Sequence, residues 1–249
     1  MSLSDSATDF LIESLENYQK GKLSFSVLHA VTATELMLKE RLSRVHLNLI
    51  YLNIDSRHIA DENTVGLKDL PQRLMNFGVR FREDELEVIR TASKWRNEIV
   101  HHMPTYSHQQ ATNNLGLLYD FLARFLYDEL QLEFTKLIPK SSFKIMDGLL
   151  KEWGKVMRKS KREAQEEGEV VLFQECPICG VLGTVCLREN NKAFCHLCES
   201  DLEVGECPVC HKQALDTHSN LDGNVYHWKC LDGMAQDYIE MWRESQLGK

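Results

Sequence analysis

Cysteine is absent from the first 175 residues of this 249-residue chain, although the chain contains eight cysteines. All eight lie near the C-terminal end, and six of them occur as Cys-x-x-Cys pairs. This distribution excludes a disulfide framework through the body of the protein. The N-terminus is polar and carries no recognisable export signal. Clustered thiols in such a chain are typical of metal binding in a reducing compartment, so we expect a cytoplasmic protein.

Long hydrophobic runs and an excess of positive charge are also missing. No apolar run approaches the roughly 18 residues that a membrane-spanning helix needs, so we expect no membrane association. The net charge is −8, with 29 basic and 37 acidic side chains. This balance argues against a protein that coats nucleic acid through general basicity, and any RNA contact must be local.

Apolar residues recur at helical spacing through the first half of the chain, which predicts a mainly α-helical protein. Helices are expected over about 7–20, 25–49, 68–77, 83–103 and 110–137, with Ser24 capping the second of them. The sequence predicts a helical bundle over 1–138 and a basic linker helix over 139–169. Two small cysteine-rich modules are expected over 170–205 and 206–249, and the second should end in a helix over 234–246.

The stretch from Lys94 to Pro104 carries the candidate chemistry. On a helical wheel its apolar residues form one broad face, and Arg96 falls within that face. The apolar residues of this face are Val88, Ile89, Ala92, Trp95, Ile99, Val100 and Met103. Asn97 and His101 are four residues apart and lie together beyond one edge of the face. Arg96 could keep its head in water while its stem packs. Buried, it would need a partner, because losing one member of a buried pair costs about 3–5 kcal/mol.

Glu35 is the candidate partner of Arg96. It lies at the centre of an apolar stripe on the second expected helix. The stripe consists of Leu28, Val31, Leu38 and Leu42. Two helices therefore each carry one charged residue on an inward face, and the two charges are opposite. We predict a buried or interfacial Glu35–Arg96 ion pair, bidentate where the geometry allows it.

Arg96-Asn97, three further residues and His101 match an R-(polar)-x-x-x-H motif, and here the chain resembles the HEPN superfamily. The preceding segment is also similar, with Thr64 to Leu70, Arg73-Leu74, Gly78-Val79 and the acidic start Glu83-Asp84-Glu85. The resemblance covers about residues 8–135 and implies an all-helical domain that dimerises and cuts RNA. Members that a partner nucleotidyltransferase modifies carry Tyr two residues after the His. Met103 stands there in this chain, which argues against that subgroup.

The resemblance implies a metal-independent endoribonuclease that leaves a cyclic phosphate, with a cleft shared by two protomers. His101 would act as general acid or base on the ribose 2′-hydroxyl or the leaving 5′-oxygen. Arg96 would stabilise charge on the phosphate, Asn97 would orient one of these groups, and Glu35 would hold Arg96. His102 is an alternative base, although it points about 100° further round the helix. Many proteins of this superfamily act in defence or toxin systems.

The segment from Lys140 to Arg162 is basic in an otherwise acidic protein, with a local charge of about +6. The candidate phosphate-binding residues are Lys151, Lys155, Arg158, Lys159, Lys161 and Arg162. Such an arm beside an RNA-cutting domain could track the nucleic-acid backbone. The alternative interpretation is an ordinary solvated helix face.

Two metal sites are expected after residue 175. Cys176, Cys179, Cys195 and Cys198 form two Cys-x2-Cys pairs separated by fifteen residues, a spacing typical of a four-cysteine zinc ribbon. Between the pairs we expect a hairpin that turns at Glu189-Asn190-Asn191. Cys186 is left over and is expected to be a small buried residue of this hairpin.

The second site consists of Cys207, Cys210, His227 and Cys230, and this pattern resembles one half of a LIM-type or other treble-clef finger. His218 is an alternative to His227 as the fourth ligand. Because each ion would have four protein ligands, both zinc ions are expected to be structural and not catalytic.

A non-catalytic function is the alternative to the nuclease. In that interpretation the helical domain binds RNA, nucleotide or protein, and the fingers provide the recognition end. The acidic residues of the finger region favour a protein partner; they are Glu199, Asp201, Glu203 and Glu206. Oligomeric state separates the two functions, because the nuclease interpretation requires a homodimer.

Overall fold

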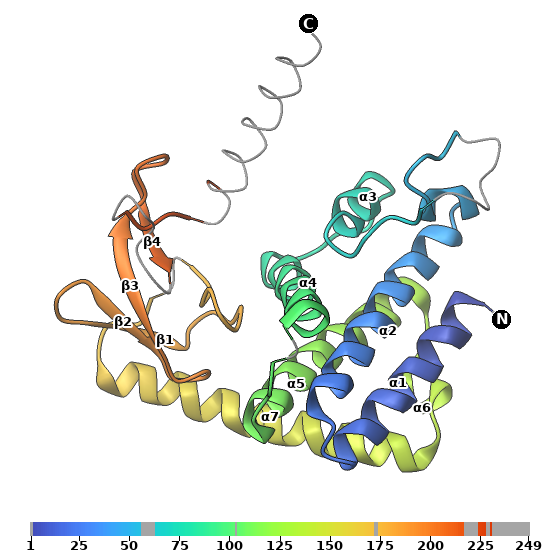
Figure 1. Cartoon of the computed structure of the whole chain (residues 1–249), viewed down its shortest axis with the longest axis horizontal. Helices are drawn as coiled ribbons and strands as arrows, with labels where there is room; N and C mark the ends of the chain where they lie inside the picture. Colours follow the sequence, from blue (N-terminus) through green and yellow to red (C-terminus); the bar gives the residue numbers. More distant parts are fainter. Residues whose placement is uncertain are drawn as a thin grey trace, which may run out of the picture. The chain divides into compact units, whose positions relative to one another are not determined.

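The computed structural model describes residues 2–55, 63–102, 104–171, 174–216, 224–227 and 230. The protein is mainly helical, with a small antiparallel sheet toward its C-terminal end (Figure 1). The chain forms two compact units, Met1–Val156 and Met157–Lys249. Among the helices of the described residues, none has the length and apolarity to cross a membrane. Met103, His218 and the helix expected over 234–246 lie outside the described residues.

The first unit is built from helices whose bounds differ from the expected ones mainly at their ends. They are α1 (Leu3–Gln19), α2 (Leu23–Ser43), the 3-10 helix η1 (Leu47–Ile50), α3 (Leu70–Asn76), α4 (Glu83–His102), α5 (His108–Phe125), the π-helical turn η3 (Leu126–Leu130), α6 (Phe134–Leu137) and α7 (Lys140–Glu167). The single helix expected over 110–137 is interrupted, because Gln131 adopts a left-handed backbone with φ of 57°. Helix α7 continues into the second unit.

Local capping explains where two of these helices begin. Ser2 and Asp5 form a capping box at the start of α1, and Ser107 and Gln110 form another at the start of α5. The prediction that Ser24 caps α2 is wrong, because the N-cap residue is Lys22. The Ser24 hydroxyl instead donates to the carbonyl oxygen of Pro104 at 2.7 Å. This bond ties the start of α2 to the segment that follows α4.

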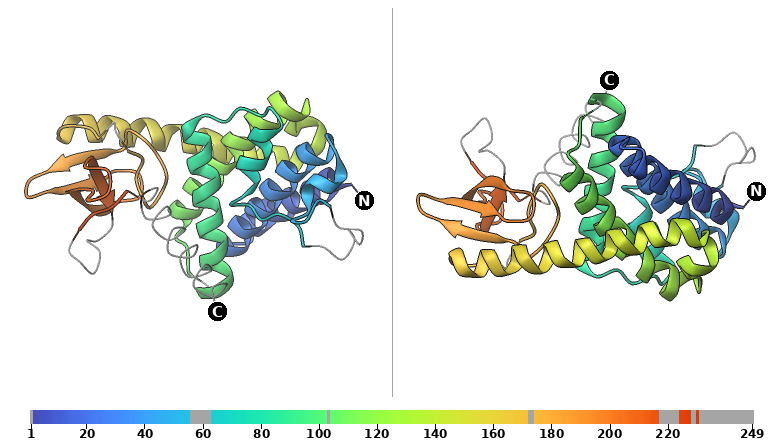
Figure 2. Two further views of the ribbon diagram at one scale, coloured as in Figure 1. Left: turned by 90° about the horizontal axis from the view of Figure 1, so that it is seen from above. Right: turned by 90° about the horizontal axis from the view of Figure 1, so that it is seen from below.

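Helix α2 lies at the centre of the first unit and packs on α1, α3, α4 and α5. Figure 2 shows α1 running alongside it. A buried hydrogen-bond network joins three of these helices: the Ser14 hydroxyl lies 2.7 Å from the Tyr119 hydroxyl and donates to the Ser26 carbonyl oxygen at 2.7 Å. The remaining core is apolar, so α2 is held on several sides and provides a fixed support for Glu35.

The second unit contains a four-stranded antiparallel sheet in the order β1-β2-β3-β4. The strands are β1 (Val185–Arg188), β2 (Lys192–Cys195), β3 (Ser200–Glu206) and β4 (Gln213–Asp216). The expected hairpin between the cysteine pairs is confirmed. Asn190 and Asn191 take φ values of 60° and 55° in its turn, a backbone region that asparagine tolerates. The sequence predicts a boundary between two modules at residues 205 and 206. Strand β3 is continuous across this position.

Candidate functional site

Helix α4 carries the candidate motif and packs on the core through a narrow apolar stripe. The buried apolar residues of this stripe are Val88, Ile89, Ala92, Trp95 and Ile99. Val100 was expected on the same face but is 57% exposed. The stripe follows the spacing 88, 92, 95 and 99, so residues 96 and 100 begin the next row of the helix, toward solvent. The apolar face is therefore narrower than the wheel predicted.

Arg96 lies in the solvent-facing row next to the buried stripe. The prediction that it falls within the apolar face is therefore wrong. Its side chain is 46% exposed, whereas that of Glu35 on α2 is 13% exposed. The two still form the expected ion pair, with Arg96 Nη1 at 3.6 Å from Glu35 Oε2. The pairing prediction is confirmed, but the pair joins a largely buried acid to a cation at the surface.

Glu35 has a second and closer partner that was not predicted. Lys39 Nζ lies 2.6 Å from Glu35 Oε1 and also donates to Thr64 Oγ1 at 3.0 Å. The Lys39 side chain is only 7% exposed, so its charge depends on this carboxylate. The signal was available in the sequence, because Glu35 and Lys39 are four residues apart on one helix.

The other motif residues lie on the exposed side of the last turns of α4. Asn97, His101 and His102 are all exposed, and the two histidine rings are 6.5 Å apart with an interplanar angle of 62°. His101 and His102 occupy the last turn of the helix. The structure therefore places Asn97, His101 and Arg96 where a solvent-borne substrate can reach them.

An apolar cleft of about 490 Å³ lies beside the end of α4. It is lined by Gly21, Lys22, Leu23, Ser24, Phe25, Leu28, Ile99, Val100, Pro104, Thr105 and Tyr106. The hydroxyl oxygen of Tyr106 is buried and has no hydrogen-bond partner within the described part of the chain. Burial, followed by the nearby charge of Glu98, raises the pKa of Tyr106 to about 12. The residues of this cleft were not predicted from the sequence, since their proximity depends on how α2 and α4 pack.

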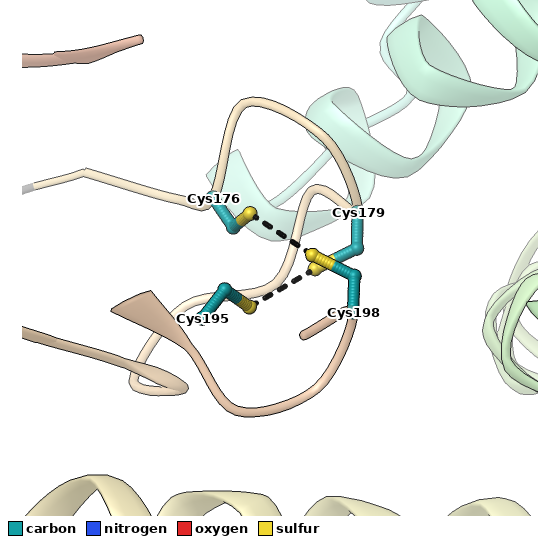
Figure 3. Close-up of side chains that lie close together, drawn as sticks. All are labelled: Cys176, Cys179, Cys195 and Cys198. Carbon is teal, nitrogen blue, oxygen red and sulfur yellow. Dashed lines mark hydrogen bonds between the residues drawn. The ribbon is translucent and has the colours of Figure 1, made fainter. Parts of the chain in front are cut away.

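The first expected metal group comes together in the second unit. The sulfur atoms of Cys176 and Cys198 are 3.7 Å apart, and those of Cys179 and Cys195 are also 3.7 Å apart (Figure 3). Hydrogen bonds from Cys176, Cys179 and Cys198 lower the pKa of Cys195 well below its ordinary value. All four thiols are free and their ligand atoms lie within 4.8 Å of one another. They could therefore hold one metal ion.

The second expected group is also assembled. The ligand atoms of Cys207, Cys210, His227 and Cys230 lie within 4.8 Å of one another, with Cys210 Sγ at 3.0 Å from His227 Nδ1. Desolvation raises the pKa of Cys207, but hydrogen bonds from the backbone of His227 and Cys210 outweigh it and bring the value to about 6. This group could hold a second metal ion, with His227 as its fourth ligand.

A third cluster was not predicted. Glu167 at the end of α7, Cys186 in β1 and His196 after β2 bring their side chains together. Cys186 is fully buried, as expected of a residue inside the hairpin. No spacing in the sequence indicates that His196, which lies within a Cys-x-x-Cys pair, contacts Cys186 and Glu167.

The candidate phosphate-binding residues are exposed along α7: they are Lys151, Lys155, Arg158, Lys159, Lys161 and Arg162. Three of them form ion pairs one turn along the helix. Lys151 pairs with Asp147 at 2.6 Å, Lys159 with Glu163 at 3.6 Å, and Arg162 with Glu166 at 3.7 Å. Within the described residues, no ion pair is found for Lys155, Arg158 or Lys161.

Comparison of the chain with protein families, with curated proteins and with solved structures finds no match.

Proposed function

We propose that the protein is a metal-independent endoribonuclease whose site consists of Arg96, Asn97 and His101, with Glu35 positioning Arg96. The observation that supports this best is the position of Arg96. Its side chain is 46% exposed and is nevertheless tethered to Glu35 at 3.6 Å. An arginine enclosed in the core could not contact RNA, whereas this one can bind a phosphate while its tether limits the conformations it must lose.

The proposed reaction is an internal transfer of the phosphoryl group. The ribose 2′-oxygen attacks the adjacent phosphorus and the bond from phosphorus to the 5′-oxygen breaks. The products are a 2′,3′-cyclic phosphate and a 5′-hydroxyl. One group must take the proton of the 2′-hydroxyl and another must protonate the leaving oxygen. His101 can do one of these, and Arg96 stabilises the charge that develops on the phosphate.

A homodimer would meet this requirement. Each protomer supplies one His101, so a cleft shared by two protomers would hold a general base and a general acid of the same chemical type. Asn97 lies one helical turn before His101 and would orient the ribose or the phosphate. The exposure of Asn97 and His101 supports such a shared surface.

The two four-ligand groups are proposed to hold structural zinc. In a tetrahedron with Zn–S bonds of about 2.3 Å, neighbouring sulfur atoms are about 3.8 Å apart. The two S···S distances of 3.7 Å in the first group agree with this value. Four protein ligands leave no position for a substrate, so these ions would support the fold of the second unit and its contact with RNA or a protein partner.

The cleft beside α4 supports a second candidate function, a non-catalytic binding module. Its apolar wall includes Phe25 and Val100, which are half exposed or more, and Lys22 lies at the same site. Such a cleft could take a nucleotide base or an apolar side chain of a protein without any chemistry.

RNA cleavage by the purified full-length protein tests the proposal. Total RNA is incubated with wild-type protein in buffer to which EDTA is added together with the RNA. We expect cleavage by the wild type and products that end in a cyclic phosphate. His101→Ala should reduce the rate by about 10²–10⁴-fold, the usual contribution of general acid–base catalysis.

The matched control is His102→Ala, which removes the adjacent histidine of the same helix turn and should retain most of the activity. Arg96→Ala should abolish cleavage because the phosphate charge would lose its stabilising group. Equal activity of wild type and His101→Ala would identify a contaminating nuclease. A folded, RNA-binding wild type that cuts nothing would contradict the nuclease proposal and favour the binding module.

A further inference from the structure

Three side chains with metal-binding atoms converge at the C-terminal end of α7, apart from the two four-ligand groups. Glu167 is the last residue of α7, Cys186 lies in β1, and His196 follows β2. His196 Nε2 is 2.9 Å from Glu167 Oε2 and 3.4 Å from Cys186 Sγ. All three ligand atoms lie within 4.8 Å of one another. Three different elements therefore bring an oxygen, a sulfur and a nitrogen to one point.

The separations fit a small tetrahedral ion. With Zn–S of about 2.3 Å and Zn–N of about 2.05 Å, the sulfur and nitrogen ligands of one ion are about 3.6 Å apart. The observed Cys186–His196 distance is 3.4 Å. The carboxylate oxygen is closer to nitrogen than the roughly 3.3 Å of such a site. Glu167 is an end residue of a helix with its side chain 35% exposed, so a shift of a few tenths of an ångström is available to it.

The histidine is held in place by its own backbone. The His196 amide donates to the Thr184 carbonyl oxygen at 2.8 Å, and the His196 carbonyl oxygen accepts from the Ser160 hydroxyl at 3.1 Å. The Phe194 ring meets the imidazole edge to face, with 5.1 Å between the centroids. A ligand fixed by such contacts loses little freedom when an ion binds.

One side of the cluster is open. A hollow of about 600 Å³ reaches His196 and Glu167 but not the fully buried Cys186. Its lining is Lys159, Glu163, Glu166, Glu167, Phe194, His196 and Glu199. Its carboxylates outnumber its one lysine, which favours a cation, although Arg188 also contacts Glu167 at 2.6 Å. An ion at the cluster would keep a coordination position that faces solvent.

We propose that Glu167, Cys186 and His196 bind a third divalent ion of the zinc class, with an exchangeable fourth ligand in this hollow. Mixed sulfur, nitrogen and oxygen donors select zinc and neighbouring transition metals over magnesium or calcium. Three protein ligands and one open position are the arrangement of a reactive or exchangeable site, in contrast to the two closed groups. The proposal does not depend on the nuclease function. The competing arrangement is a hydrogen-bonded triad in which the Glu167 carboxylate accepts hydrogen bonds from both partners.

Metal content of the full-length protein separates the two arrangements. Wild-type protein and variants are dialysed against buffered zinc in excess, and zinc per chain is measured by mass spectrometry. We expect three ions in the wild type and two in Cys186→Ser, whose hydroxyl is nearly isosteric with the thiol but binds zinc poorly. Glu163→Gln removes a carboxylate of the same hollow that does not belong to the cluster, and it should retain three.

The kinetics of metal release give a second measurement. A colorimetric chelator should remove one ion per chain rapidly from the wild type and the other two slowly, because the proposed site is open and the four-ligand groups are closed. The rapid phase should be absent in Cys186→Ser, with the slow phase and the circular dichroism spectrum unchanged. Two ions in saturated wild type, or a third ion that survives in Cys186→Ser, would overturn the proposal.

Discussion

Glu35 on α2 reaches Arg96 on α4 with 3.6 Å between carboxylate and guanidinium, and the same carboxylate lies 2.6 Å from Lys39. The two cations differ in environment, since the side chain of Arg96 is 46% exposed and that of Lys39 is 7% exposed. One acid therefore neutralises a buried charge and positions an exposed one. Its removal should affect both stability and function.

We expect Glu35→Gln to lower the free energy of unfolding by about 3 kcal/mol, because the Lys39 charge would remain buried without a counter-charge. Arg96→Gln should lower it by less than about 1 kcal/mol, since its half of the network is exposed to solvent. Urea denaturation of the two variants measures the difference. Equal midpoints for wild type and Glu35→Gln would show that Lys39 does not depend on Glu35.

Packing between α5 and α7 gives a second prediction. A methyl group at Gly116 would lie 2.6 Å from both Cβ and Cγ of Trp153, closer than atoms can approach. We expect Gly116→Ala to destabilise the protein by about 1–3 kcal/mol through overpacking. Thermal unfolding followed by far-ultraviolet circular dichroism measures this loss.

Gly148 provides the matched control, because it is an exposed glycine within α7 and a methyl group there would meet nothing within 4 Å. Gly148→Ala should raise the stability by about 0.5–1 kcal/mol, the usual difference between alanine and glycine in a helix. A destabilising Gly148→Ala, or a neutral Gly116→Ala, would contradict the packing of α7 on α5.

The helical class, the approximate helices and both four-ligand groups could be predicted from the sequence because each is encoded by local spacing. The spacing of apolar residues alone, however, does not determine which face of a helix contacts the core. Arg96 lies only about 100° from Trp95 on the wheel, and the contact of α4 with the core decides which of them is buried. The cluster of Glu167, Cys186 and His196 depends on tertiary packing between α7 and the sheet, so no spacing in the sequence reports it.

The Tyr106 hydroxyl leads to a prediction about alkaline pH. It is buried without a hydrogen-bond partner among the described residues, so Tyr106→Phe loses no hydrogen bond and should match or exceed the wild type in stability at neutral pH. Folding raises the pKa of Tyr106 from 10.0 to about 12. The unfolded chain therefore releases this proton first as the pH rises, and the wild type loses stability between about pH 10 and 12.

The phenylalanine variant lacks this loss, so its advantage in melting temperature should grow from neutral pH to about pH 11. Other tyrosines ionise in both proteins and cancel in the comparison. A constant difference between the two proteins across this range would show that the Tyr106 hydroxyl is accessible to water.

Chelation should act on the two units differently. Around the second group the buried core is small and includes Cys207, a candidate metal ligand, with Ala214, Val225 and Tyr226. Metal-linked folding contributes about 10–16 kcal/mol in comparable small sites, so removal of the ions should unfold the sheet. The first unit has its own large apolar core and should keep its helical circular dichroism signal.

Serine variants assign the ions to their groups. Cys176→Ser and Cys207→Ser should each reduce the metal content by one ion, because each removes a thiolate from a different four-ligand group. The measurement is metal per chain after gel filtration. Loss of two ions in either single variant would indicate that the two groups fold as one cooperative unit.

If the protein binds RNA as proposed, the exposed cations of α7 are its candidate phosphate contacts. Lys151, Lys155, Arg158 and Arg162 follow the spacing of a single helical face, and all four are exposed. Lys151 and Arg162 already pair with carboxylates, whereas Lys155 and Arg158 have no ion pair among the described residues. Phosphates would therefore bind most readily at these two. Removing a cation that neutralises one phosphate of single-stranded RNA should reduce the slope of log affinity against log salt by about 0.7.

The double variant Lys155→Ala/Arg158→Ala should thus weaken RNA binding and lower this slope by about 1.4. Lys159→Ala/Lys161→Ala is the matched control with the same change of charge. Lys159 pairs with Glu163, and the Lys161 stem lies near Gly183, so this variant should change the slope less. Fluorescence anisotropy over a range of salt concentrations measures both, and the His101→Ala background prevents cleavage during the titration. Equal slopes for the two double variants would mean that RNA senses only the overall charge of α7, as expected of an ordinary solvated helix face.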